Sequence, residues 1–147
     1  MSRHAQANNI KRIIDANINR AKEGLRVSEE ITRFILDNRR LTAEFKKIRH
    51  GIEVILKRLP QTTVLLQERE SLKDVGRHIY IRELERKDYR DIFFANIQRV
   101  KESVRVLEEF SKLFNRKAAI QLKKIRYRVY EIEKKAAQKI PPLRHLG

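Results

Sequence analysis

The sequence predicts an all-α protein, a four-helix bundle built from two repeated helical hairpins with a long irregular crossover between them. Three observations carry this prediction. Apolar residues recur every three or four positions in four long segments, prolines stand at the ends of two of them, and the second half of the chain repeats the first. A chain of 147 residues fits one domain, with a first repeat over residues 10–59, a crossover over 60–87 and a second repeat over 88–140.

The first helix is expected between Ile10 and Asp37, and the second from Leu41 to Leu59. The apolar stripe of the first helix consists of Ile14, Ile18, Ala21, Leu25, Ser28 and Ile35. Pro60 ends the second helix because proline has no backbone N–H to continue the hydrogen-bonding pattern. The chain between the two helices is short, so we expect them to pack as an antiparallel hairpin.

The third and fourth helices follow the same pattern and meet near Asn115. The stripe of the third consists of Phe93, Ile97, Val100, Val104, Leu107 and Phe114. The stripe of the fourth consists of Leu122, Ile125, Val129, Ile132 and Ala136. Pro141 and Pro142 end the last helix. Residues 60–87 have mixed spacing, and a connection of this length is uncommon in a compact domain. We expect there either a lid or binding loop or a partly helical linker.

The charge balance favours an anionic partner. The chain has 35 Lys and Arg against 19 Asp and Glu, a formal net charge of +16, and residues 115–147 hold ten of the basic residues against two acidic ones. Nucleic acid, a lipid surface and a phosphorylated small molecule all fit such a charge. The last helix has only two tyrosines, too few for a base-stacking platform, so nucleic acid is the less favoured partner.

Several classes of function are excluded by what the sequence lacks. Without cysteine there is no disulfide scaffold, thiolate zinc site or cysteine nucleophile. The glycine-rich loops that cradle phosphates are absent, and the four histidines lack metal-ligand spacing. The apolar runs are far shorter than a membrane span, so we expect a soluble, cytoplasmic protein without a membrane partner.

The repeat exceeds what packing requires. Residues 15–34 and 94–113 are identical at ten of twenty positions at an offset of 79, and residues 46–49 match 123–126 at an offset of 77. Most shared positions are charged, and a solvated helix face rarely requires one particular charged residue. Two alternatives stay open: the charges form ordinary ion pairs, Arg20 with Glu23 and Arg26 with Glu29 and Glu30, or recent duplication left the identity without a function.

A polar stripe lies beside the apolar stripe of each first helix, at 100° per residue. In the first repeat it consists of Asn17, Arg20, Glu23, Val27 and Glu30. Arg49 and Arg126 flank the core positions of the second helices. We expect the polar stripes of the two repeats to line one polar cleft.

These strings resemble a known family. Residues 14–30 and 95–110, with Ile48-Arg49-His50, Asp74-Val75-Gly76 and Ile125-Arg126-Tyr127, are similar to the small monofunctional hydroxymethylpyrimidine phosphate kinases of thiamine biosynthesis. The resemblance covers roughly residues 10–135. In that family the domain stands alone or is fused ahead of thiamine phosphate synthase, and this chain is too short to include the synthase barrel.

The resemblance implies a kinase that transfers the γ-phosphoryl group of ATP to hydroxymethylpyrimidine phosphate and gives the diphosphate. It implies ATP as co-substrate and Mg²⁺ as cofactor. An acceptor phosphate oxygen is already anionic near neutral pH, so alignment and charge neutralisation suffice for catalysis. The alternative is a basic helical module that binds nucleic acid or another protein.

We take the candidate site residues from the repeat and the helical wheel. The expected catalytic residues are Arg20, Arg99, Glu23 and Glu102. The expected phosphate-binding residues are Arg26, Arg49, Arg105, Arg126 and Gly76. Asn17 and Asn96 are expected to read the pyrimidine, and Glu30, Glu109 and Asp74 to bind the metal, in a set with Glu23 and Glu102. The expected partners are the pyrimidine monophosphate and ATP, with thiamine phosphate synthase and a second copy of the chain left open.

Overall fold

The computed structural model describes residues 1–59 and 84–142. These residues form four α-helices and one π-helical turn, and they contain no strand, which confirms the all-α prediction. The elements are α1 (Arg3–Glu30), η1 (Ile31–Ile35), α2 (Arg39–Leu56), α4 (Tyr89–Ser111) and α5 (Arg116–Lys139). Most of the expected crossover, including Asp74 and Gly76, lies outside the described residues.

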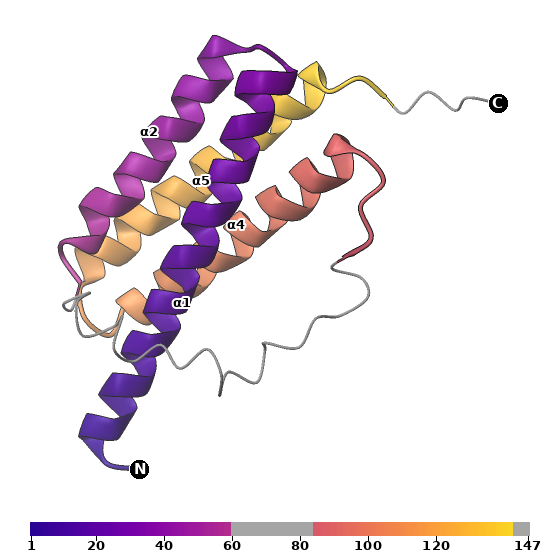
Figure 1. Ribbon diagram of the computed structural model, residues 1–147. Coiled ribbons are helices and arrows are strands. Elements are labelled where there is room, and N and C mark those ends of the chain that lie inside the picture. The colour runs from indigo at the N-terminus through magenta and orange to yellow at the C-terminus, as the bar shows by residue number, and fades with distance from the viewer. Residues whose placement is uncertain (60–83, 143–147) are drawn as a thin grey trace.

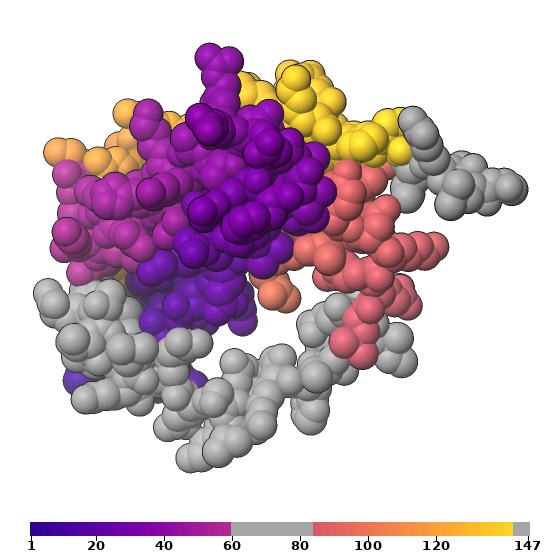
Figure 2. All heavy atoms as spheres, turned by 45° about the horizontal axis from the view of Figure 1, so that its top comes forward, coloured from indigo at the N-terminus to yellow at the C-terminus, as the bar shows by residue number. Residues whose placement is uncertain are grey.

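The four helices pack as a bundle of two hairpins (Figure 1). In the main contacts α1 packs against α2 and α4, and α5 packs against the same two helices. Figure 2 shows α1 flanked by α2 on one side and by α4 on the other. The bundle therefore has one layer formed by the first helices of the two repeats, α1 and α4, and another formed by the second helices, α2 and α5.

Each helix begins at a polar residue whose side-chain oxygen accepts a backbone N–H of the first turn. These residues are Ser2 for α1, Asn38 for α2, Asp88 for α4 and Asn115 for α5. Such caps satisfy N–H groups that have no partner within the helix. Asn38 and Asn115 are 77 residues apart, so the repeat also determines where both second helices begin.

The apolar stripes form the core, with two corrections. Ile35 and Phe114, expected at the ends of their stripes, are 51% and 38% exposed. A π-helical turn, Ile31–Ile35, follows α1, and its wider turn moves Ile35 out of the register that the α-helical spacing gives. Phe114 lies beyond the end of α4 at Ser111. All the other stripe residues are buried.

The first helices of the two repeats approach each other closely at Gly24. A Cβ atom at this position would lie 2.7 Å from Val100 Cγ2 and 2.9 Å from the Asn96 carbonyl oxygen. Only a residue without a side chain allows this approach, because the backbone carbonyl cannot move aside. The contact places the C-terminal third of α1 directly against the middle of α4.

Candidate functional site on the α1–α4 layer

In each hairpin one largely buried arginine–glutamate ion pair joins the two helices. Arg49 Nη2 lies 3.1 Å from Glu29 Oε2 between α2 and α1, and Arg126 Nε lies 2.7 Å from Glu108 Oε2 between α5 and α4. Both contacts are two-pronged, with a second N–H···O contact of 3.4 Å each. The two pairs occupy equivalent positions of the repeat, so each repeat forms the same interhelical ion pair.

Arg49 and Arg126, two of the expected phosphate-binding residues, thus have carboxylate partners within the protein. The Glu108 hydrogen bond is the main reason that the pKa of Arg126 lies above its ordinary value, with Tyr130 adding to it. Sequence reasoning gave Glu29 only as an i,i+3 ion-pair partner of Arg26 and gave Glu108 no separate role. The signal that could have found them is their place four residues after a buried position of the stripe, where a helix faces its neighbour.

The other repeated charges of α1 and α4 mostly form surface pairs. Arg26 Nε lies 3.5 Å from Glu30 Oε1, and Arg105 Nη2 lies 3.1 Å from Glu109 Oε1, both at the i,i+4 spacing. In the second hairpin Lys112 Nζ also lies 3.0 Å from the same Glu109 oxygen. These contacts fit the ordinary ion-pair alternative, which accounts for Arg26, Arg105 and their glutamates without a ligand.

The repeated lysines of these helices are paired across the hairpins. Lys22 Nζ lies 3.3 Å from Glu53 Oε1, and Lys101 Nζ lies 2.8 Å from Glu133 Oε2. The acceptors come from α2 and α5. Lys22 and Lys101 therefore each form an ion pair between the two helices of their hairpin.

Four repeated charges remain, which we call the charged quartet: Arg20, Glu23, Arg99 and Glu102. All four are exposed, and within the described ranges none has an oppositely charged group within 4.0 Å. Glu102 accepts a hydrogen bond of 3.1 Å from Gln98 Nε2. The expected Arg20–Glu23 pair is thus not formed, and packing gives no reason for these residue types.

The quartet gathers where α1 and α4 meet. Arg20 and Glu23 lie within four residues of Gly24, and Arg99 and Glu102 lie within two residues of its contact Val100. Four residues of helix span about 6 Å. At 100° per residue, these side chains lie on the side of the contact away from the core. The structure thus brings together the four expected catalytic residues on one exposed face of the α1–α4 layer.

Asn17 and Asn96, expected to read the pyrimidine, flank the same contact. Asn17 Nδ2 donates to the Ile13 carbonyl and Asn96 Nδ2 to the Ile92 carbonyl, both at 2.8 Å. Asn17 is buried and Asn96 is partly buried. Each amide thereby satisfies one donor on its own helix, and the side-chain oxygens have no hydrogen-bond partner within the described ranges. These oxygens are free to accept an N–H from a ligand.

The expected metal ligands do not form a cluster in the part of the chain that the structure describes. Glu30 and Glu109 lie in the surface pairs above, and Asp74 lies outside the described residues. Residues 1–59 and 84–142 contain no group of three or more His, Asp or Glu side chains arranged to hold a metal ion. Mg²⁺ commonly needs only one or two carboxylates when phosphates complete its shell, and Glu23 and Glu102 fit that requirement.

The fold and the repeat together define a class: a duplicated four-helix protein with exposed repeated charges near the contact between its two first helices. The sequence profile of the ThiD2 family matches residues 12–135, and the chain belongs to this family. None of the described helices combines the length and the apolar character needed to cross a membrane.

The curated relatives are longer proteins named thiamine-phosphate synthase. The one from Synechocystis is 42% identical over 125 residues, covering 84% of this chain and 35% of the relative. The one from Nostoc punctiforme is 40% identical over 125 residues, covering 84% and 34%, and the one from Rhodopirellula baltica is 36% identical over 139 residues, covering 91% and 37%. No solved structure gives a significant match.

The chain thus spans about a third of the length of these curated relatives. Family membership and the relatives support a role in thiamine biosynthesis. The relatives carry the name of a synthase and not of a kinase, so they leave the particular reaction of this chain to be argued from its site.

Proposed function

We propose that this chain is a kinase of thiamine biosynthesis that transfers the γ-phosphoryl group of ATP to hydroxymethylpyrimidine phosphate. The observation that carries the proposal is the charged quartet. Among the repeated charges of α1 and α4, these four side chains alone lack an ionic partner in the described ranges, and they meet at one exposed place. The resemblance to the pyrimidine phosphate kinases supplies the reaction.

The quartet has the chemistry that this transfer needs. The acceptor phosphate oxygen is already an anion, so no side chain has to remove a proton from it. Arg20 and Arg99 bind the γ-phosphate of ATP and the phosphate of the acceptor, and they neutralise the charge on the phosphoryl group that is transferred. Glu23 and Glu102 are the residues that would hold Mg²⁺, which would supply further positive charge for the phosphates.

The asparagines orient the acceptor in this proposal. The free side-chain oxygens of Asn17 and Asn96 accept hydrogen bonds, and the amino group of the pyrimidine is a donor that fits them. Arg49, with 22% of its side chain exposed, is the better placed of the two paired arginines to add a phosphate contact. Arg126, with 12% exposed, stays with Glu108.

The longer relatives suggest how the product is used. The match covers about a third of the length of these relatives. In our proposal a thiamine phosphate synthase, on the same or a separate chain, consumes the diphosphate. A homodimer is not needed for the quartet to form, since all four side chains come from one chain.

The direct test incubates the purified protein with MgATP and hydroxymethylpyrimidine phosphate and follows ADP and the diphosphate. We expect Arg20→Ala and Arg99→Ala each to lower kcat about 10²-fold, the usual cost of one charge-stabilising group, with little change in Tm. Arg12→Ala, an exposed arginine of α1 outside the quartet, is the control. Separate KM values for ATP and for the pyrimidine assign each arginine to one substrate.

Two results would count against the proposal. One is the absence of diphosphate when circular dichroism shows a folded helical protein. The other is a loss of folded protein in both arginine variants with unchanged activity per folded molecule, which would make the charges structural.

A further inference from the structure

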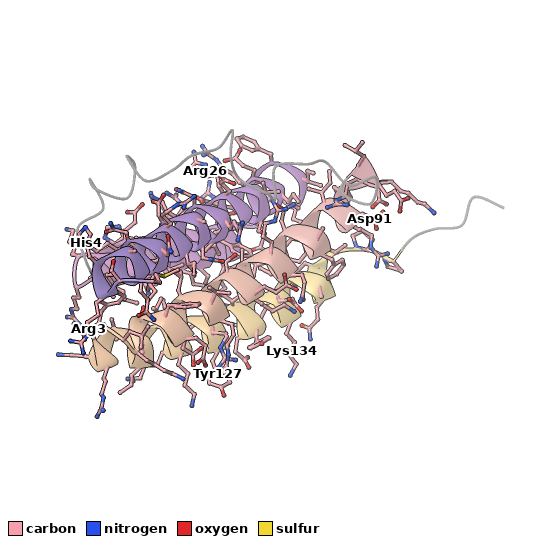
Figure 3. The ribbon with its side chains drawn as sticks, turned by 90° about the horizontal axis from the view of Figure 1, so that it is seen from below. Arg3, His4, Arg26, Asp91, Tyr127 and Lys134 are labelled. Carbon is pink, nitrogen blue, oxygen red and sulfur yellow. The ribbon has the colours of Figure 1, made fainter. Side chains whose placement is uncertain are left out.

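The positive charge of the protein is concentrated on the layer opposite the quartet. Helices α2 and α5 carry fourteen Lys and Arg against four Glu, whereas α1, η1 and α4 carry eleven Lys and Arg against eight Asp and Glu. The quartet site thus lies on a nearly balanced layer, and most of the excess charge lies elsewhere. Figure 3 shows the two layers edge-on, with Arg26 on one side of the bundle and Tyr127 and Lys134 on the other.

The excess charge forms a repeated stripe along the contact between α2 and α5. We call this surface the basic seam and define it as Arg40, Lys47, Lys117, Lys124 and Arg128. Arg40 is equivalent to Lys117, and Lys47 to Lys124, at the offset of 77. All five side chains are exposed, and none has a carboxylate within 4.0 Å in the described part of the chain.

The helical wheel places the seam residues together. At 100° per residue, Lys117, Lys124 and Arg128 fall within about 40° of one another on α5. Arg40 and Lys47 take the matching position on α2. The two helices are close here, because a Cβ atom on Gly51 would lie 3.2 Å from Ile125 Cδ1. From Lys117 to Arg128 the α5 part of the seam extends about 16 Å, about half a turn of a nucleic-acid duplex.

We propose that the basic seam binds the phosphate backbone of double-stranded nucleic acid. Unpaired Lys and Arg side chains, repeated along two helices, neutralise phosphates without reading bases. The sequence left nucleic acid as the less favoured partner because charge alone supported it. The concentration of unpaired Lys and Arg on α2 and α5, away from the quartet, is the added observation, although Glu44, paired with Lys135 at 3.3 Å, lies along the same contact.

The seam fits a duplex better than a single strand. A single strand needs aromatic faces on which bases stack. The two tyrosines of α5 lie outside the seam, and each has a cation near its ring: Arg126 Cζ lies 5.2 Å from the Tyr127 ring centre, and Lys101 Nζ 5.4 Å from that of Tyr130.

Fluorescence anisotropy of labelled DNA and RNA duplexes of about 20 base pairs tests the proposal. We expect both to bind at 50 mM salt and to lose about 10²-fold in affinity at 200 mM, the loss for four neutralised phosphates. Comparison of the affinities for the DNA and the RNA duplex identifies which of the two is preferred. Lys47→Glu with Lys124→Glu should weaken binding more than tenfold and leave phosphoryl transfer unchanged, so failure of this proposal is separate from failure of the kinase proposal.

The matched control is Arg3→Glu with Arg12→Glu, which makes the same charge change on exposed positions of α1. It should weaken binding less than threefold, with both variants folded by circular dichroism. Absence of duplex binding at 50 mM salt would overturn the proposal, as would equal losses in the seam and control variants. Tighter binding of a polyglutamate chain than of either duplex would assign the seam to an acidic protein instead.

Discussion

The buried arginine–glutamate pairs of the two hairpins differ in how tightly they are held. Arg126 lies 2.7 Å from Glu108, with side-chain exposures of 12% and 5%, whereas Arg49 lies 3.1 Å from Glu29, with exposures of 22% and 8%. Arg105 Nη1 adds a second contact to Glu108 at 3.6 Å. The arginine–glutamate pair is thus shorter, more buried and has one more contact in the second hairpin than in the first.

The difference comes from positions where the repeat has diverged. The residue after Arg126 is Tyr127, whose ring lies against the guanidinium, and the residue after Arg49 is His50, with 77% of its side chain exposed. Both hairpins have the ion pair, and the residues that follow its arginine differ between them. The arginine of the first hairpin is the more exposed of the two.

Breaking each pair measures this difference and has the largest effect we expect. Glu108→Gln keeps the volume but leaves Arg126 buried without its counter-charge, which costs about 3 kcal/mol of the free energy of unfolding. Glu29→Gln should cost about half as much, because Arg49 is nearer to water. Urea denaturation gives both values, and Glu30→Gln, which breaks an exposed pair, should stay within about 0.5 kcal/mol. Equal losses for Glu108→Gln and Glu29→Gln would show that the hairpins are equally closed.

The contact between α1 and α4 offers a second comparison, with an intermediate effect. Gly24 is equivalent to Ser103 at the offset of 79. Gly24→Ala normally stabilises a helix by about 1 kcal/mol, but here the new Cβ meets a backbone carbonyl, and we expect a net loss of about 1–2 kcal/mol. Ser103→Ala removes one hydrogen bond of 2.6 Å to the Arg99 carbonyl and should cost less than about 1 kcal/mol. A more stable Gly24→Ala variant would mean that the helices do not approach as closely as described.

Gly24→Ala also bears on the proposed site, because α1 and α4 would have to move apart beneath the quartet. We therefore expect it to lower kcat more than its effect on stability explains. Ser103→Ala leaves the spacing of the helices unchanged, so its kcat should stay close to that of the wild type.

Most of the fold could be predicted from the sequence, because four long segments carry a clear helical period. The end of the apolar stripe of the first helix could not be predicted. The π-helical turn at Ile31–Ile35 depends on how the chain joins α1 to α2, and its residues have no composition that marks it. The exposure of Ile35 follows from that turn and was therefore missed as well.

The candidate site could be predicted only as a set of positions. Arg20 and Arg26 are both exposed, both repeated and both followed by a glutamate at pairing distance in the sequence. Only the structure shows that Arg26 pairs with Glu30 while Arg20 has no ionic partner in the described ranges. The choice depends on side-chain direction relative to α4, which the period of a single helix does not contain.

The ends of α1 and α4 give the last comparison and the smallest expected effect. In the second hairpin Lys112 donates a hydrogen bond of 3.0 Å to Glu109, and this bond is the main reason that the pKa of Glu109 lies below its ordinary value of 4.5. Arg33 has the equivalent position in the first hairpin, and its guanidinium lies 4.8 Å from the centre of the Phe34 ring. The basic residue therefore binds a carboxylate at the end of α4, whereas at the end of α1 it lies near an aromatic ring.

Lys112→Met should therefore raise the pKa of Glu109 toward 4.5, measured by NMR titration of the side chain. A carboxyl whose folded pKa is lowered adds stability above its unfolded pKa and loses it as the pH falls through the folded pKa. The loss in the wild type accordingly falls below pH 4.5, and the variant lacks most of this acid dependence. Arg33→Met, the control, should leave the titration of Glu109 unchanged. If Lys112→Met did so too, Arg105 would be the residue that lowers this pKa, and the two helix ends would be alike.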